Sequence, residues 1–314
     1  MSNSLNVLVT GATAGIGRYL SLDLARRGHR VFATGRRADA LESLRAEAEK
    51  LGLSIIPVVL DVTKEETIAS AAKSVHEACA SGAEQGRGGG ALDVLINNAG
   101  YGQAGPLAEM SDETLRKQFD TNVFGVMSVT RAFLPLMMDR RAGTIINVSS
   151  TGGLLTAPMM GAYHASKYAL EAMSDALRME LSPFGIRVVV VEPGPIQSEF
   201  TGRTLAGLPA GHEDSAYAAV YARSDELGAR MMKMSAGPEH VAKAVRKAIF
   251  SRWPRARYIA PSWHALPFML LPFAPQRLID FVFKSLLGLN KRLPTSRKTA
   301  QAPVSGKVAV ARAA

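Results

Sequence analysis

A tyrosine and a lysine four residues apart form the pair in this sequence best suited to acid–base chemistry. Tyr163 and Lys167 stand in the run YHASK, within a segment that we expect to be helical. Positions i and i+4 project from one face of a helix, so the ammonium would lie close to the phenol. A tyrosine with an ordinary pKa of about 10 is a poor base near neutrality, but a neighbouring positive charge would lower that pKa. The same spacing occurs in surface pairs without chemistry, so the prediction needs support from the rest of the chain.

A glycine-rich turn near the N-terminus is suited to binding a phosphate. Residues 10–17, TGATAGIG, follow an apolar run and open a predicted helix. Backbone N–H groups and the helix dipole converge on an anion at such a point, and glycines leave room for a pyrophosphate. The spacing differs from the common G-x-G-x-x-G fingerprint, so the strand–turn–helix setting carries the prediction. We expect dinucleotide contacts from Gly11, Thr13, Gly15, Ile16 and Gly17.

Two arginines at the end of the second predicted strand indicate which dinucleotide binds. Arg36 and Arg37 stand where an NAD-preferring site usually has a carboxylate on the ribose 2′-hydroxyl. The planar donors of arginine suit a 2′-phosphate, so we predict NADP(H), with Arg36 favoured over Arg37. A solvated arginine pair at a helix start is the structural alternative, and nearby Asp39 keeps NAD open.

The elements that must position these residues alternate along the chain. Apolar runs separated by helical stretches predict strands at Val7–Thr10, Val31–Thr34, Ile55–Leu60, Val94–Ile96, Thr144–Val148 and Arg187–Val191. This order is typical of a single Rossmann-like α/β domain, a doubly wound parallel sheet whose two faces are covered by helices. Between the first two strands, Ile16, Leu20 and Leu24 recur at helical spacing and Gly28 provides a stop.

These motifs, together with others in the same order, resemble the short-chain dehydrogenase/reductase family in its NADP-dependent classical subgroup. The resemblance extends from about Asn6 to Phe200. It rests on Thr10-Gly11-x-x-x-Gly15-x-Gly17, Asp61-Val62, Asn97-Asn98-Ala99-Gly100, Asn122, Ser149-Ser150, Tyr163-x-x-x-Lys167 and Pro193-Gly194-Pro195-Ile196. Each block alone is weak, but their joint occurrence in order is specific.

The resemblance implies four catalytic residues. Ser150, thirteen residues before Tyr163, would hydrogen-bond the substrate carbonyl or hydroxyl, and Ser149 would be structural. Lys167 would bind the nicotinamide ribose and tune Tyr163, which would shuttle the hydroxyl proton while a hydride moves to or from the nicotinamide. Asn122 would hold a water of the proton relay, with a helix-bending polar residue as its structural alternative.

The resemblance also implies further cofactor contacts. Asp61 and Val62 would border the adenine, with an ordinary strand-end carboxylate as the structural alternative for Asp61. In the turn after the fourth strand, Asn98 would contact the adenosine side and Gly100 would allow close backbone approach, with a purely structural turn as the rival. The remaining contacts would come from Ala99 of that turn and from the nicotinamide loop, Pro193, Gly194, Ile196 and Ser198. Ser198 stands where many relatives have threonine, and it keeps the hydroxyl.

The segment from residue 197 to Pro238 is expected to shape the substrate pocket. It contains Tyr217, Tyr221 and the run MMKM at 231–234, which would form either a lid over an apolar ligand or a packed helix. Similarity to steroid- and retinol-type members favours a hydrophobic secondary alcohol and its ketone or aldehyde as the substrate class. A 3-oxoacyl thioester reductase is the enzymatic alternative, and an NADP(H)-sensing scaffold is the non-enzymatic one.

Charge and composition limit the other possibilities. With 314 residues, of which 47% are hydrophobic, we expect one catalytic domain at 1–290, with a variable substrate region at about 197–290. The formal net charge of +10 falls to +4 for residues 1–290 without the six cations Lys291, Arg292, Arg297, Lys298, Lys307 and Arg312. The acid-free segment 291–314 is predicted to be a disordered tail. Because the excess charge lies there without interleaved aromatic residues, nucleic acid is not an expected partner.

The remaining features concern location and association. A lone cysteine, Cys79, no metal-ligand cluster and no signal peptide favour a cytoplasmic protein without a metal. Glycine-rich Ser81–Gly90 is predicted to be a surface loop. The apolar run Ala265–Pro275 and the helix-like Gln276–Leu289 are too interrupted to span a membrane, so peripheral contact with an anionic membrane, subunit packing and core burial stay open. The family resemblance implies a homodimer or homotetramer.

Overall fold

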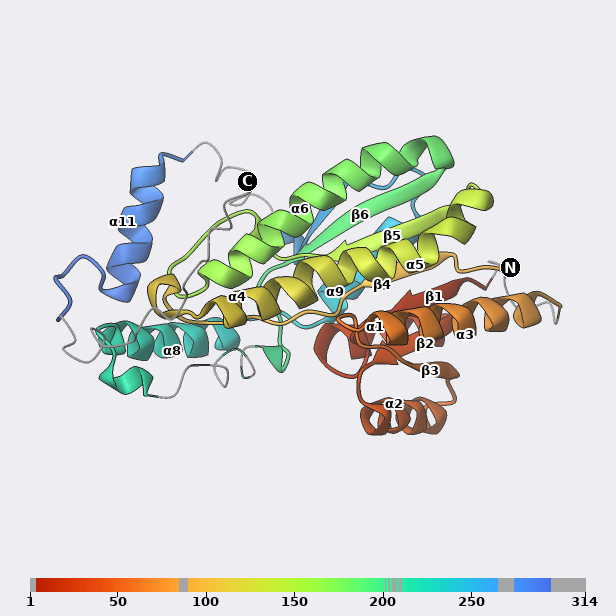
Figure 1. The fold of residues 1–314 in the computed structure, drawn as a ribbon, viewed down its shortest axis with the longest axis horizontal. Helices are drawn as coiled ribbons and strands as arrows, with labels where there is room; N and C mark the ends of the chain where they lie inside the picture. The colour runs from red at the N-terminus through yellow and green to blue at the C-terminus, as the bar shows by residue number, and fades with distance from the viewer. Residues whose placement is uncertain are drawn as a thin grey trace, which may run out of the picture.

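A parallel sheet organises the protein. The computed structural model describes residues 4–84, 90–200, 202, 204, 208, 211–264 and 274–294. Within these residues, seven strands pair in the order β3-β2-β1-β4-β5-β6-β7, all parallel (Figure 1). The strands are β1 Asn6–Val9, β2 Arg30–Gly35, β3 Ile55–Val59, β4 Val94–Asn97, β5 Gly143–Val148, β6 Ile186–Pro193 and β7 Arg257–Ala260. The Rossmann-like doubly wound fold predicted from the sequence is confirmed.

Helices pack on both faces of this sheet and bury its apolar strands. One core cluster joins the sheet to α1 (Gly15–Arg26), α2 (Ala38–Lys50) and α9 (Glu239–Phe250). The cluster on the other face draws on α3 (Glu65–Glu84), α5 (Gly125–Asp139) and α6 (Gly161–Leu181). Central β1 is buried along its whole length because β2 and β4 flank it, which explains why its residues are all apolar except Asn6.

The first β–α–β crossover forms as the apolar spacing predicts. Leu20 and Leu24 of α1 are buried against the sheet. The helix ends at Arg26, and Gly28 then adopts a left-handed φ of +82°, which glycine accommodates without a Cβ penalty. The end of β1 is thereby joined to α1 by the glycine-rich turn.

Three details of the fold differ from the sequence prediction. A seventh strand, β7, pairs with β6, although its four residues are too short to give an apolar pattern. β3 is an edge strand, and Pro57 and Val59 are exposed, so not every strand is covered on both faces. The predicted loop Ser81–Gly90 begins too early, because α3 continues to Glu84. Residues 85–89 of that loop lie outside the described residues.

The C-terminal helices α8 (Ala218–Lys233) and α11 (Gln276–Leu287) lie together at one end of the molecule, beyond the sheet (Figure 1). Met159, Val220, Tyr221 and Leu287 form a small separate core there. The apolar run at 265–273 and the tail at 295–314 fall outside the described residues, as do most positions between 201 and 210. The shorter elements are η1 Leu107–Glu109, α4 Asp112–Phe119, η2 Asp120–Phe124, η3 Thr151–Gly153, η4 Ser182–Phe184, η5 His212–Asp214 and η6 Ser262–His264.

Candidate active site

The glycine-rich turn is packed so closely that side chains are excluded from it. A Cβ on Gly17 would lie 2.3 Å from the carbonyl oxygen of Gly11, and a Cβ on Gly11 would lie 2.9 Å from Ala99 Cα. Gly11 and Gly15 also have left-handed φ values of +64° and +51°. The turn therefore requires glycine for its backbone shape and for its contact with the end of β4.

The start of α1 leaves backbone donors available for an anion. The N-cap residue, Ala14, has no side chain that could accept from the first turn, and no acidic residue lies in that turn. The first N–H groups of a helix lack partners within the helix, and they carry the positive end of its dipole. Ile16 packs against the core beneath, and Thr13 lies against Gly35 at the end of β2. This arrangement fits a dinucleotide pyrophosphate.

Asn98 holds the glycine-rich turn against β4. Its side-chain amide donates to the carbonyls of Thr10, at 2.9 Å, and of Gly11, at 3.3 Å. The Thr10 hydroxyl in turn accepts from the backbone N–H groups of Asn98 and Ala99, both at 2.9 Å. This geometry gives Asn98 a bracing role; its adenosine-side contact stays a prediction.

The two arginines after β2 differ in their surroundings. Both are exposed, but the Arg37 guanidinium lies 4.0 Å from the Asp39 carboxylate. Within the described residues, Arg36 has no ion pair at salt-bridge distance. The charge of Arg36 acts on Asp61. Burial would raise the pKa of the Asp61 carboxyl, but hydrogen bonds from Thr63 and the charge of Arg36 hold that pKa below its usual value. Arg36 is thus the freer of the two cations.

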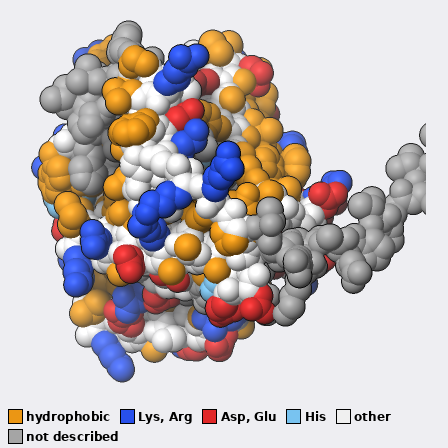
Figure 2. All heavy atoms as spheres, turned by 90° about the vertical axis from the view of Figure 1, so that its left-hand side faces the viewer, with side chains coloured by type: hydrophobic (Ala, Val, Ile, Leu, Met, Phe, Trp, Pro, Cys, Tyr) orange, Lys and Arg blue, Asp and Glu red, His pale blue; other side chains and the backbone are white. Residues whose placement is uncertain are grey.

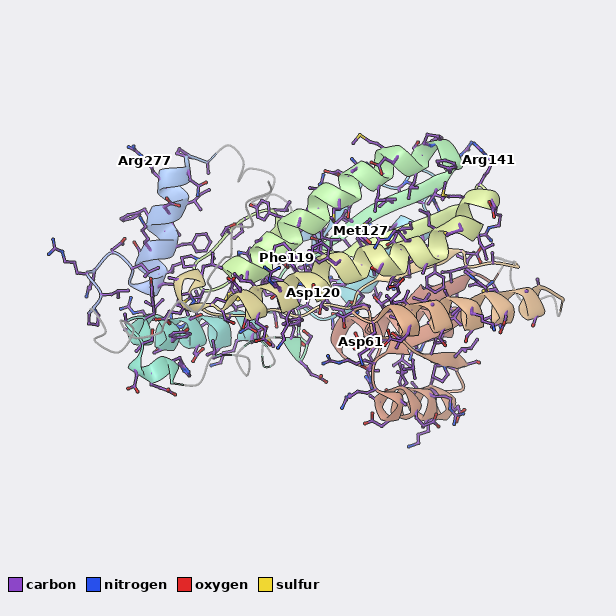
Figure 3. The ribbon with its side chains drawn as sticks, in the orientation of Figure 1. Asp61, Phe119, Asp120, Met127, Arg141 and Arg277 are labelled. Carbon is purple, nitrogen blue, oxygen red and sulfur yellow. The ribbon has the colours of Figure 1, made fainter. Side chains whose placement is uncertain are left out.

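Asp61 ends the third strand and organises the turn that follows. Its carboxylate accepts from the backbone N–H of Thr63 at 3.0 Å and from the Thr63 hydroxyl at 2.8 Å. Figure 3 shows Asp61 beside the red end of the sheet, near α3. Val62 is buried, and its carbonyl would lie 2.8 Å from a Cβ on Gly125.

Tyr163 and Lys167 lie on one face of α6, as their spacing predicts, and both are almost fully buried. The Lys167 ammonium lies 5.9 Å from the centre of the Tyr163 ring and donates to the carbonyl of Val148 at 2.9 Å. Burial lowers the pKa of Lys167 to about 8, against the opposing effect of Glu171. Burial raises the pKa of Tyr163 to about 12, although a hydrogen bond with Ser150 acts to lower it. The lowered tyrosine pKa expected from the sequence is therefore not produced by the protein's own residues, because desolvation outweighs them.

Ser150 is held at the end of β5 with its hydroxyl directed toward Tyr163. The hydroxyl accepts from the backbone N–H of Gly152 at 3.0 Å and donates to the carbonyl of Pro193 at 3.4 Å. Neighbouring Ser149 is buried, and its backbone N–H bonds to Val191. The chain therefore presents the second serine of the pair to Tyr163.

Asn122 lies in a π-helical turn, η2, between α4 and α5. Figure 3 marks Phe119 and Asp120 at this junction. The Asn122 amide nitrogen donates to the Tyr101 carbonyl and to the Ser166 hydroxyl, both at 3.0 Å, and its oxygen accepts from the Tyr101 N–H at 3.1 Å. π-turns often occur at functional sites. The water that Asn122 would hold stays a prediction.

Gly100 marks the point where these groups converge. A Cβ there would lie 3.1 Å from the Asn122 side-chain oxygen and 3.7 Å from the Lys167 ammonium. Three segments that are distant in the sequence, those of Gly100, Asn122 and Lys167, thus meet beyond the carboxyl end of β4. Open parallel sheets bind their ligands at this edge.

The loop after β6 closes the site from the other side. Gly194 donates to the Ala260 carbonyl, and Ile196 is buried and bridges to Ala236. Ser198 packs over the glycine-rich turn, where a Cβ on Gly15 would lie 3.2 Å from its own. Ser198 is thereby brought next to the predicted phosphate site, and the Pro193 carbonyl lies at Ser150. The cofactor contacts of Gly194 and Ile196 stay a prediction.

Phe200 is a site residue that the sequence did not identify. Its ring centre lies 5.3 Å from that of Tyr163, and a Cβ on Gly102 would lie 2.7 Å from its Cζ. Tyr163 is only 8% exposed beneath it. Phe200 stands at the end of the motif-bearing region, and no spacing in the sequence links it to Tyr163.

A partly buried cluster of charges links the helix of Lys167 to β6 and β7. Arg257 of β7 contacts Glu171 at 3.1 Å, Glu192 at 3.2 Å and Asp175 at 2.7 Å. Burial, followed by the charge of Glu171, raises the pKa of Glu192 to about 8. This cluster could not be predicted from the sequence, because its members come from α6, β6 and the unpredicted β7.

Comparison with known proteins places the chain in a family. Residues 5–208 match the short chain dehydrogenase family. The NADPH-dependent 3-dehydrocapnine reductase of Ornithobacterium rhinotracheale is 32% identical over 280 residues, which cover 88% of this chain and 95% of that protein. Human retinol dehydrogenase 8 is 38% identical over 204 residues, 64% of this chain and 61% of that protein. A short-chain dehydrogenase structure from Streptomyces avermitilis has a TM-score of 0.67 at 31% identity, covering 92% and 97% of the two chains.

The chain belongs to the short-chain dehydrogenase family and is an oxidoreductase. The resemblance stated from the sequence motifs is confirmed.

Proposed function

We propose that residues 1–290 form an NADP(H)-dependent catalytic domain that interconverts a hydrophobic secondary alcohol and its ketone or aldehyde. The observation that carries this proposal is the convergence at Gly100. There the Asn122 side-chain oxygen and the Lys167 ammonium both lie within 3.7 Å of the place that a Cβ on Gly100 would take. The Tyr163 ring lies 5.9 Å from that ammonium, and Ser150 hydrogen-bonds Tyr163. A site of this composition can bind a ribose and transfer a proton next to it.

The cofactor proposal rests on the glycine-rich turn and on Arg36. The free donors at the start of α1 suit the pyrophosphate, and Arg36 lies exposed at the end of the strand from which an adenosine 2′-phosphate would be reached. The NADPH dependence in the name of the Ornithobacterium relative supports the same cofactor. Lys167 would bind the nicotinamide ribose, and the loop from Pro193 to Ser198 would meet the nicotinamide.

The protein's own groups would supply the proton and the orientation. When bound, the cofactor supplies or accepts the hydride. In the direction of reduction, Ser150 hydrogen-bonds the substrate carbonyl, and Tyr163 donates its phenolic proton to that oxygen. The Lys167 cation stabilises the phenolate left behind, and its proton is available because its pKa is about 8. Oxidation follows the reverse path, with Tyr163 as the base.

The substrate class is proposed from the apolar surroundings of Tyr163. Phe200 covers the tyrosine, and Met159 and Tyr221 form the nearby C-terminal core. The name of the human relative, a retinol dehydrogenase, and that of the 3-dehydrocapnine reductase support an alcohol–carbonyl couple. A 3-oxoacyl thioester remains the alternative substrate.

A substrate and cofactor panel tests the proposal. Ketones, aldehydes, alcohols and 3-oxoacyl thioesters are offered with NADPH, NADH, NADP+ or NAD+, and nicotinamide absorbance is followed. We expect turnover of hydrophobic ketones or secondary alcohols with NADP(H). Turnover confined to thioesters would select the alternative, and NADP(H) binding without any turnover would favour a sensing scaffold.

A further inference from the structure

The outward side of α11 is apolar and exposed. Leu278, Phe281, Val282 and Leu286 are between 45% and 62% exposed, whereas Leu287 is buried. With about 3.6 residues per turn, these four side chains form one continuous side of the helix, which faces away from Leu287. Core burial, one of the options that the sequence left open, is therefore wrong for these four residues.

Positive charge accompanies this apolar side. Arg277 and Lys284 are two helical turns apart and line the edge next to Phe281. From Ala274 onward the sequence has eight Lys and Arg residues and one acid, Asp280, whose carboxylate accepts from Gln276 at 3.0 Å. Figure 2 looks onto this end of the molecule, where Lys and Arg side chains lie among hydrophobic ones, and Figure 3 places Arg277 at its periphery.

α11 is attached to the part of the fold that carries the candidate active site. Leu287 packs in one cluster with Met159 and Tyr221. Met159 belongs to the loop between Ser150 and Tyr163, and its carbonyl accepts from the Gly105 N–H at 2.7 Å. A surface that binds α11 would therefore lie on the same end of the molecule as this loop.

We propose that α11 docks the protein on the surface of an anionic lipid bilayer. Phe281, Leu278 and Leu286 enter the acyl boundary, while Arg277 and Lys284 reach the lipid phosphates. Among the described residues no helix is long and apolar enough to cross a membrane, so the contact is with the surface. A second copy fits less well, because an antiparallel two-fold contact through this side would bring the cationic edges together.

Vesicle flotation of the full chain tests this proposal. Vesicles made of equal parts phosphatidylcholine and phosphatidylglycerol are compared with pure phosphatidylcholine vesicles. We expect binding to the anionic vesicles only, with release at high salt. The double variant Leu278→Ser/Phe281→Ser should bind about tenfold or more weakly, because it removes two inserted side chains. Arg277→Gln and Lys284→Gln should each weaken binding by about fivefold.

Trp253→Ser is the matched control, since Trp253 is 82% exposed but lies outside α11. It should float like the unchanged protein, and NADPH binding should be the same in every variant, which separates docking from the proposed activity. Equal flotation of the Leu278→Ser/Phe281→Ser variant would overturn the proposal, since the basic tail alone would then hold the vesicle. The proposal would also be overturned if the unchanged protein did not float with the anionic vesicles. It would be overturned as well if the unchanged protein were a dimer that the Leu278→Ser/Phe281→Ser variant dissociates.

Discussion

Glu171 follows Lys167 by one turn of α6, and each residue is only 5% exposed. The carboxylate opposes the desolvation of the ammonium and keeps its pKa higher than burial alone would. Arg257 holds Glu171 in place from β7. A charge cluster that touches no expected ligand thus acts on the lysine of the candidate site.

We predict that the protonation of Lys167 makes NADPH binding pH-dependent. Below its folded-state pKa of about 8 the side chain is a cation, and above it the charge is lost. The affinity for NADPH, measured by fluorescence titration, should therefore decline as the pH rises through about 8. Glu171→Gln should move this decline toward lower pH, since it removes the charge that supports the ammonium.

Two controls identify the titrating group. Asp175 contacts the same Arg257, so Asp175→Asn should leave the decline in NADPH affinity in place. Glu192→Gln removes the other group with a pKa near 8 and should also leave the decline in place. Lys167→Arg should abolish the decline, because a guanidinium stays charged. A decline that follows Glu192 instead of Lys167 would refute this assignment.

Gly17 is predicted to be irreplaceable in the glycine-rich turn. A Cβ there would lie 2.3 Å from the Gly11 carbonyl oxygen and 2.4 Å from the Asn98 amide nitrogen. Gly17→Ala should therefore distort the turn and weaken NADPH binding by about a hundredfold, equivalent to about 3 kcal/mol. Gly228→Ala is the matched control, a helical glycine whose added Cβ meets no atom within 4 Å. Equal NADPH affinity in both variants would show that the glycine-rich turn does not bind the cofactor.

Arg36 is predicted to select the phosphorylated cofactor. Arg36→Asp should weaken NADPH binding about tenfold to a hundredfold, the range for losing a charge-assisted hydrogen bond, and should affect NADH less. Arg37→Asp is the comparison, because Arg37 lies near Asp39 and should matter less. Calorimetric titration of both cofactors measures the difference. Equal losses for NADPH and NADH would argue against a phosphate contact.

The sheet and its first crossover could be predicted because buried parallel strands are continuously apolar. β1 and β2 illustrate this, as does the spacing of Leu20 and Leu24 in α1. β7 could not be predicted in this way, since four residues, one of them Arg257, give no such run. The end of α3 was placed too early because Ser81 and Gly82 favour loops, whereas packing of the preceding turns keeps them helical.

The candidate site was predictable where its chemistry depends on local spacing. Tyr163 and Lys167 lie on one helix, so four residues suffice to place them together. The contacts of Phe200, Glu171 and Arg257 depend on tertiary packing, and no local pattern records them. The raising of the Tyr163 pKa by burial could not be predicted, because burial depth is not visible in the sequence.

Tyr163→Phe provides the most direct test of the proposed chemistry. The substitution removes the phenolic proton but keeps the ring that packs against Phe200. We expect kcat with NADPH and a hydrophobic ketone to fall by about a thousandfold, within the range for a general acid, while the Kd for NADPH stays unchanged. Turnover that is largely retained at unchanged NADPH affinity would contradict the role of Tyr163 as the proton donor.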